Sequence, residues 1–295
     1  MESCRNFLLD LVVQQVEIQA AEQGGRLQQT TSKNEIIVYA LNQLPPIYVA
    51  TEKDWQIQLN QPLASLRTAI EDAIYYAIEN LWINPFRTFQ VHAVERELPA
   101  ISLQRLQKLL GKDNLTWRQL PEAVQTALEY RSQPPSPSPQ PLSSEYISYM
   151  LPARLHCYHA LRLPVTRLAI EKLNRYPPEV IKQVRIEEIV AMALSQLPPM
   201  YASNTEDLLS HRQRAKQELG SKFERIVDLA VQSARKEFFN QSLPLLFHQI
   251  KAERRQAMNL LKHYFQDNQV NWRTCADFVE NALEEVKQRN KSHQP

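Results

Sequence analysis

The chain has 295 residues, of which 43% are hydrophobic and 22% are charged, and its formal net charge is +2. Only four residues are glycine, which excludes the closely spaced glycines of P-loop and Rossmann phosphate sites. The three cysteines are scattered along the chain, which favours a reducing, cytoplasmic location over a disulfide framework.

The residue composition also predicts the fold class. Leucine, alanine, glutamine and glutamate are frequent while glycine is rare, and this balance favours helices over sheets. No segment approaches the ~20 consecutive apolar residues that a transmembrane helix needs. Asp10 interrupts the apolar segment near the N-terminus, so the sequence does not predict a signal peptide there. We therefore expect an all-α protein that is cytoplasmic and does not bind membranes.

The first helices are predicted from amphipathic patterns. An opening helix is expected near residues 7–22, and a second helix within the segment 34–48, NEIIVYALNQLPPIY. The second helix should end near Gln43, because Pro45 follows and the residue before a proline is pushed out of helical geometry. Its apolar side has helical spacing and should face the core. This side consists of Ile36, Ile37, Ala40, Leu41 and Leu44.

The opposite side of this second helix carries groups suited to binding. Glu35, Tyr39 and Asn42 stand at positions i, i+4 and i+7, so they form one stripe of a carboxylate, a phenol and a carboxamide. A tyrosine ring can stack on a planar ligand, and an asparagine can both donate and accept hydrogen bonds. The alternative is a plain solvent face, or a helix–helix interface anchored by Tyr39.

A long helix is predicted next, over residues 62–81. Its apolar residues recur near heptad spacing, which indicates either a core-facing stripe or the seam of a helical dimer. These residues are Leu63, Leu66, Ile70, Ala73, Ile74, Ala77 and Leu81.

The chain is internally duplicated. Residues 187–201, EEIVAMALSQLPPMY, repeat residues 34–48 at an offset of 153 positions. A second match places Trp272 as the counterpart of Trp117, and the proline-rich segment 132–144 separates the copies. We therefore predict two tandem helical modules, 1–131 and 145–295, joined by a semi-rigid linker at 132–144. The copies are expected to form an intramolecular pseudo-dimer, or the chain a homo-dimer.

The second copy keeps the apolar face but changes the polar stripe. Its stripe reads Glu188, Met192 and Ser195, so the aromatic ring and the amide are missing. Ile186 stands in place of Lys33. The second copy is therefore expected mainly to supply the other half of the pseudo-dimer.

The run from residue 33 to residue 55, KNEIIVYALNQLPPIYVATEKDW, resembles the bacterial late-competence ComFB family. The resemblance implies a helical, usually dimeric module that binds cyclic di-GMP, and in some members cyclic di-AMP, and signals to a protein partner that is not identified. It also implies ligand contacts at Lys33, Glu35, Tyr39, Asn42, Pro46, Tyr48 and Thr51. In such a site Lys33 would pair with phosphate and a tyrosine would stack on a purine.

Two other functions remain open from the sequence. The chain could be a helical adaptor that has lost its ligand, or a nucleic-acid binder using basic residues of its second half. Those basic residues are Lys251, Arg254, Arg255 and Lys262.

Enzymatic and metal chemistry are not predicted. His156, Cys157 and His159 are too crowded to converge on one zinc ion, and no G-x-S-x-G or H-E-x-x-H motif occurs. We therefore expect no catalytic residues, no metal and no cofactor apart from the signalling ligand.

Overall fold

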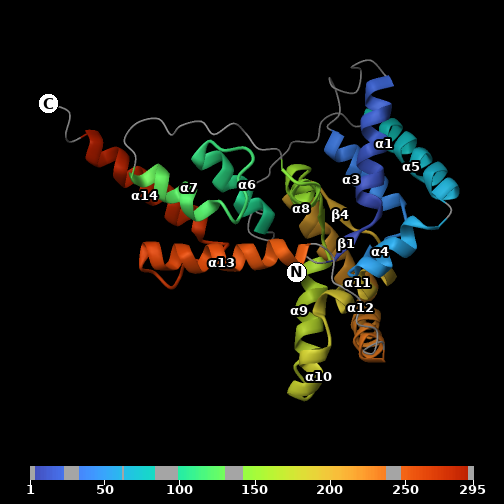
Figure 1. Ribbon diagram of the computed structural model, residues 1–295. Coiled ribbons are helices and arrows are strands. Elements are labelled where there is room, and N and C mark those ends of the chain that lie inside the picture. Colours follow the sequence, from blue (N-terminus) through green and yellow to red (C-terminus); the bar gives the residue numbers. More distant parts are fainter. Residues whose placement is uncertain are drawn as a thin grey trace. The chain divides into compact units, whose positions relative to one another are not determined.

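Helices dominate the computed structural model, which describes residues 4–22, 33–61, 63–83, 99–129, 142–236 and 247–291 (Figure 1). The strands within these ranges are two residues long and form two separate antiparallel pairs. The prediction of an all-α protein with two tandem helical modules is confirmed. In the described ranges, no helix combines the length and apolar content needed to cross a membrane.

The first copy is built around the helix that carries the repeated motif. Its elements are β1 (Arg5–Asn6), α1 (Leu8–Glu22), α3 (Lys33–Gln43), β2 (Tyr48–Val49), α4 (Glu52–Leu59) and α5 (Leu63–Ile83). Helix α3 ends at Gln43 as predicted, and its buried side packs against α1 and α5, which lie beside it in Figure 1. On α5, Ile70, Ala73, Ile74 and Ala77 are buried, so most of the predicted stripe is core.

The second copy repeats this arrangement. Its elements are β3 (Tyr158–His159), α9 (Arg162–Leu173), α10 (Pro178–Gln183), α11 (Ile186–Gln196), β4 (Tyr201–Ala202) and α12 (Thr205–Lys236). Even single backbone bonds recur, since the Phe7 N–H donates to the Ile47 carbonyl at 2.8 Å and the Ala160 N–H to the Met200 carbonyl at 2.7 Å. The duplication in sequence is therefore a duplication in three dimensions.

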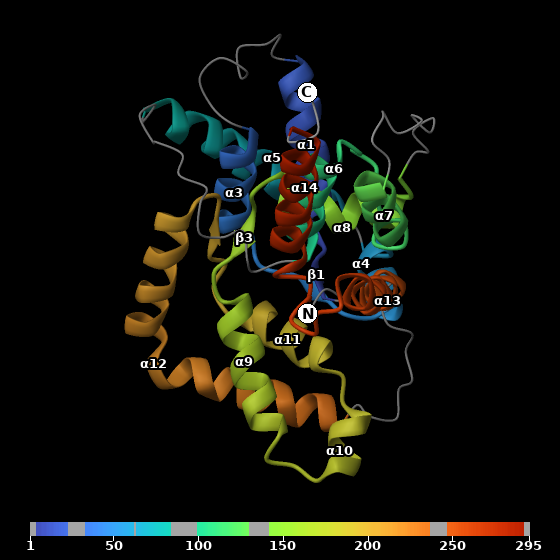
Figure 2. The same cartoon turned by 90° about the vertical axis from the view of Figure 1, so that its left-hand side faces the viewer.

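The copies differ after the second strand. The first copy has two helices, α4 and α5, separated near Asn60, whereas in the second copy two helical segments follow each other directly within α12. Helix α12 bends at Gly220, where φ is 43° and ψ is −125° (Figure 2). Residues with a Cβ rarely adopt this backbone conformation, so the bend depends on glycine. Sequence reasoning placed α5 correctly but did not predict α4.

Five further helices form a separate group. They are α6 (Pro99–Leu110), α7 (Leu120–Glu129), α8 (Ser144–Arg154), α13 (Phe247–Phe265) and α14 (Cys275–Lys291). Helices α6 and α7 are joined by a short turn, and α13 and α14 are joined by the corresponding turn in the second copy; each such helix–turn–helix pair is called a hairpin below. The indole of Trp117 is fully buried and donates to the hydroxyl of Tyr149 on α8 at 3.0 Å.

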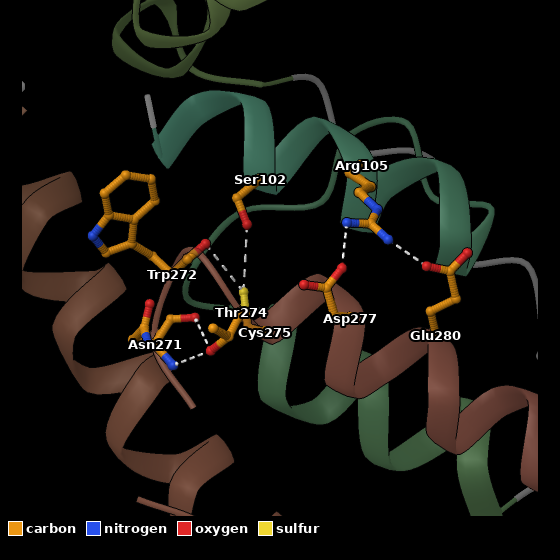
Figure 3. Close-up of polar contacts among 8 residues, drawn as sticks. All are labelled: Ser102, Arg105, Asn271, Trp272, Thr274, Cys275, Asp277 and Glu280. Carbon is orange, nitrogen blue, oxygen red and sulfur yellow. Dashed lines mark hydrogen bonds and ion pairs between the residues drawn. The ribbon is translucent and has the colours of Figure 1, made fainter. Parts of the chain in front are cut away.

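Helix α14 packs on α6 through polar contacts (Figure 3). Arg105 on α6 lies between two carboxylates of α14, donating to Asp277 at 2.6 Å and also to Glu280. The Ser102 hydroxyl lies 3.5 Å from the Cys275 sulfur. These contacts hold the first copy's hairpin to the second copy's hairpin.

The compact units combine segments of both copies. The first unit comprises Met1–His92 and Leu155–Leu245, and the second comprises Ala93–Arg154 and Leu246–Pro295. The first unit thus takes one segment from each predicted module. The second unit combines residues 93–131 of the first module with residues 145–154 and 246–295 of the second. Of the predicted linker 132–144, residues 132–141 lie outside the described residues.

Candidate functional site

The two copies meet in the first unit through equivalent tyrosines. Tyr48 follows α3 and Tyr201 follows α11, and their hydroxyl oxygens lie 2.7 Å apart. The side chains are 9% and 4% exposed, respectively. Burial raises the pKa of both phenols, so both stay protonated at neutral pH. A buried, uncharged pair therefore marks the junction between the copies.

The polar stripes of the two central helices fix this junction reciprocally. Asn42 on α3 binds the backbone of Tyr201: its amide donates to the carbonyl at 2.9 Å and accepts from the N–H at 2.6 Å. Ser195 on α11 does the same for Tyr48, accepting from the N–H at 2.9 Å and donating to the carbonyl at 3.4 Å. Each stripe therefore binds the strand of the opposite copy.

The positions beside the tyrosine pair break the symmetry. Asn6 donates to the Tyr201 hydroxyl at 2.6 Å and accepts from the Leu8 N–H at 3.0 Å. Its counterpart His159 accepts from the Leu161 N–H through Nδ1 at 3.3 Å, so Nε2 carries the proton. In the part of the chain that the structure describes, this buried Nε2 has no hydrogen-bond partner. Burial, reinforced by the charges of Arg162 and His211, lowers the pKa of His159 to about 3.

A groove of about 520 Å³ opens beside the junction, between the first copy's β2–α4 segment and the second copy's α11. Its lining comprises Tyr48, Val49, Ala50, Thr51, Lys53, Asp54, Ile57, Gln58, Glu188, Ala191, Met192, Ser195 and Gln196. The groove thus belongs to neither copy alone.

Local contacts hold the α4 wall of the groove in place. Thr51 caps α4, with its hydroxyl accepting from the Asp54 N–H at 3.1 Å and donating to the Asp54 carboxylate at 2.6 Å. Trp55 on the next turn packs edge-on against Phe7, with ring centroids 5.1 Å apart, and Arg5 lies over its ring. The position of α4 is therefore fixed against β1 and the residue that follows it by cation–π and aromatic contacts.

The groove offers mixed hydrogen-bonding chemistry. Lys53 is exposed and brings an ammonium group, while Asp54 and Glu188 bring carboxylates. Glu188 is paired with Arg185, the N-cap residue of its helix. Two glutamine amides, of Gln58 and Gln196, add groups that donate and accept, while the Ser195 hydroxyl is bonded to the Tyr48 backbone. Such a lining suits a ligand that has both an anionic part and a polar ring edge.

The structure separates the residues predicted to bind ligand. Tyr48 and Thr51 line the groove. Asn42 points to the other copy and holds the Tyr201 backbone. The remaining four lie outside the groove lining. Lys33 is exposed, and Glu35, Tyr39 and Pro46 are partly buried.

Sequence reasoning missed the groove residues Lys53, Asp54, Glu188 and Ser195. The sequence does point to two of these residues, Glu188 and Ser195, because they belong to the polar stripe of the second copy. That stripe was expected only to complete the pseudo-dimer. The stripe lines the groove because the two copies pair reciprocally, so that the stripe of α11 faces the strand of the first copy.

The remaining candidate residues, for metal and for nucleic acid, do not line the groove. Within the described ranges, no three histidine, cysteine or acidic side chains are grouped so that they could hold a metal ion. Lys251, Arg254, Arg255 and Lys262 all lie on α13, in the second unit.

Comparison with known proteins identifies a family. The family model of the late competence development protein ComFB matches residues 5–85 and 164–237. These ranges correspond to the first copy from β1 to α5 and to the second from α9 to α12. No curated protein and no solved structure matches the chain.

Proposed function

The chain belongs to the ComFB family, and from that premise we propose that it is a receptor that binds a cyclic dinucleotide, cyclic di-GMP or cyclic di-AMP, in the groove between its two copies. The observation that carries the proposal is the groove itself. Its volume of about 520 Å³ falls in the range of small-molecule sites, and Tyr48 and Thr51 of the family motif line it.

The groove lining provides the contacts that such a ligand needs. The exposed Lys53 ammonium pairs with a phosphate of the ring, because charge-assisted bonds to phosphate are strong. Asp54 and Glu188 accept from the N–H groups of a base edge, as carboxylates do for exocyclic amines. Binding needs no catalytic group, and we propose that the protein acts without chemistry.

Signalling to a protein partner follows from where the groove lies. Both copies contribute to its walls, so a bound ligand adds contacts that exist only in the paired arrangement. Ligand binding therefore stabilises that arrangement by its binding free energy, and a partner that recognises it binds more tightly. The three cysteines are free and buried, which supports a reducing cytoplasm as the site of action.

The test is calorimetric titration of the full chain with cyclic di-GMP, cyclic di-AMP and their linear dinucleotides as controls. We expect saturable binding of one cyclic ligand, weakened about tenfold by Lys53→Ala, because one phosphate contact is lost. Ile57→Trp should abolish binding, since the indole fills the groove from a half-exposed position.

Two matched variants complete the design. Lys33→Ala removes an exposed lysine of the same motif outside the groove, and Ile18→Trp adds an indole at an exposed site on α1. Both should keep wild-type affinity. Absence of heat with either cyclic ligand, or equal losses in Lys33→Ala and Lys53→Ala, would reject binding in this groove.

A second function, that of an adaptor that binds no ligand, is favoured by one observation. Asn42 and Tyr48 of the motif are already bonded to Tyr201 of the other copy. Pairing of the two copies is therefore a sufficient role for both residues, without a bound ligand. The adaptor predicts that neither cyclic dinucleotide shifts the melting temperature, whereas a receptor gains stability with ligand concentration.

A further inference from the structure

The hairpin α13–α14 exposes positions that are buried in its counterpart α6–α7. The two hairpins align through their turns, where Gly111 and Gln266 both have positive φ. In this alignment Ala100 and Gln107, both buried, correspond to Arg255, which is exposed, and Lys262, which is partly exposed. On one side of α13, cations therefore occupy positions whose counterparts on α6 are buried.

The tryptophans of the two turns differ in the same way. On the first hairpin, helix α8 covers Trp117, whose N–H groups donate to the hydroxyls of Tyr146 and Tyr149. On the second hairpin, Trp272 is partly exposed and the guanidinium carbon of Arg273 lies 4.1 Å from its ring centroid. Figure 3 shows Trp272 on the turn that precedes α14. Trp117 is thus covered by the tyrosines of a helix, whereas Trp272 is covered by an exposed cation, Arg273.

Helix α5 carries a face with the complementary character. Tyr75 and Tyr76 are 58% and 57% exposed, and the exposed acids Asp72 and Glu79 flank them. The Tyr75 hydroxyl donates to the Glu79 carboxylate at 2.7 Å. The other side of α5 packs on α3, so the tyrosines are not needed for the core of their own unit.

The second copy lacks this face. The counterparts of the two tyrosines are Asp228 and Leu229, and Asp228 forms an ion pair with Lys172 on α9. Exposed tyrosines between acids are therefore a feature of the first copy alone. A purely structural helix surface gains nothing from two large exposed aromatic rings, which are typical of binding surfaces.

We propose that the chain binds a second copy of itself by docking this acidic tyrosine face of α5 (Asp72, Tyr75, Tyr76 and Glu79) on the basic face of α13 (Arg255 and Lys262), in the hairpin that also carries Trp272 and Arg273. Asp72 and Glu79 are seven residues apart, as are Arg255 and Lys262. Both pairs therefore span about 10 Å along their helices, and the opposite charges can meet two by two.

The tyrosines of α5 favour a helix over a nucleic-acid strand as the partner of the basic face. In the first hairpin a helix carrying tyrosines covers the tryptophan, and α5 supplies tyrosines on a helix together with the acids that the basic face needs. A nucleic-acid strand would satisfy the cations but would leave the tyrosine face of α5 unexplained. Since each chain carries both faces, association gives a closed dimer with two such contacts or an open row of chains.

The experiment is sedimentation velocity of the full chain over a range of concentrations and at low and high salt. We expect concentration-dependent association that weakens as salt rises. Arg255→Glu with Lys262→Glu should weaken it at least about tenfold, and so should Asp72→Lys with Glu79→Lys, because each places like charges opposite one another. Circular dichroism checks that each variant is folded.

The decisive measurement is made on a mixture of the basic-face and acidic-face variants. Each variant alone should associate more weakly than the wild type, but a mixture of the two restores both opposite-charge contacts and should associate like the wild type. Lys216→Glu with Lys222→Glu, at exposed positions of α12, changes the net charge equally and should have no effect.

Several results would overturn the proposal. A wild-type chain that stays monomeric at every concentration would do so, as would a mixture that fails to associate. Basic-face variants that lose only oligonucleotide binding would assign that face to nucleic acid instead. None of these outcomes depends on whether a cyclic dinucleotide binds, so this proposal and the proposed function stand or fall separately.

Discussion

At the residue scale, the junction between the copies is asymmetric at one position. Asn6 satisfies both ends of its amide, whereas its counterpart His159 uses only Nδ1. The ring of His159 lies edge-on to both tyrosines, with centroids 5.7 Å from Tyr48 and 4.8 Å from Tyr201. Protonating this ring would place a charge among buried neutral groups, which explains its lowered pKa.

We predict that His159 makes folding stability fall in mild acid. The pKa of His159 is about 3 in the folded chain and ~6.5 in the unfolded chain. Above about pH 6.5 the ring is neutral in both states, so its titration costs no folding stability there. As the pH falls from there towards 3, the unfolded chain binds a proton that the folded chain does not. Stability is then lost at up to about 1.4 kcal/mol per pH unit. Urea denaturation at several pH values measures this slope.

The matched variant is His159→Asn, which copies Asn6. It should flatten the slope below about pH 6.5, because the buried imidazole of His159, which titrates in the unfolded chain, is removed. His263→Asn, at an exposed site on α13, should leave the slope unchanged. An unaltered slope in His159→Asn would show that other groups cause the acid dependence, and the half-buried His211 is the first of these, since burial also lowers its pKa.

The candidate site could be predicted from sequence only in part. Side-chain spacing correctly placed Asn42 on a polar stripe opposite the core, but its partner is the backbone of Tyr201, far along the chain. No local pattern encodes which surface of the other copy a stripe will face. For the same reason Lys53 was overlooked, because it matters only where α11 lies across from α4.

At the element scale, helices with a clear start, stripe and stop were predictable. The helix of the motif ends at Gln43 and the long helix begins at Leu63, close to the expected limits. Helix α4 was missed because none of its residues is buried. Its apolar residues Trp55, Ile57 and Leu59 alternate instead of following a helical period, and the helix depends on the Thr51 cap and on the contacts of Trp55.

The two hairpin turns allow a prediction about helix ends. After α6 and α13, the residue that turns the chain has a φ of 62° at Gly111 and 52° at Gln266. The same backbone bonds close both turns, from Lys112 to Gln107 at 2.9 Å and from Asp267 to Lys262 at 3.2 Å. Positive φ is costly for a residue with a Cβ, so the second turn is the more strained.

Gln266→Gly should therefore stabilise the protein by about 1 kcal/mol, and Gly111→Ala should destabilise it by a similar amount. No atom lies within 4 Å of a Cβ added at Gly111, so the loss arises from the backbone and not from a clash. Thermal and urea unfolding of both variants measure the two changes. Shifts of the same sign in both would contradict a cost set by φ.

At the scale of the whole molecule, each copy is divided between the two compact units. The first unit pairs α3 of one copy with β4 of the other, and the second pairs α6 with α14. Hydrogen bonds between the copies occur in both units, at Asn42–Tyr201 and at Arg105–Asp277. The continuity of the chain between the copies is therefore not what holds them together.

This arrangement predicts that a cut between the copies leaves the protein assembled. A protease site inserted within 132–141, in the predicted linker, would give two fragments on a denaturing gel. Under native conditions the fragments should co-elute and sediment like the uncut chain, because buried contacts in both units join them. The expectation is specific to a chain whose cores are shared, since modules with independent cores would separate once cut.

A variant at the junction makes the test quantitative. Tyr201→Phe leaves the Asn6 amide and the Tyr48 hydroxyl without the partner they share, at a cost of about 1–3 kcal/mol. After cutting, this cost appears in the affinity between fragments, so the variant fragments should dissociate at a higher concentration than the wild type. Tyr264→Phe, at an exposed site on α13, should change nothing. Fragments that part at once in the wild type would mean that each copy folds alone and that the shared cores contribute little.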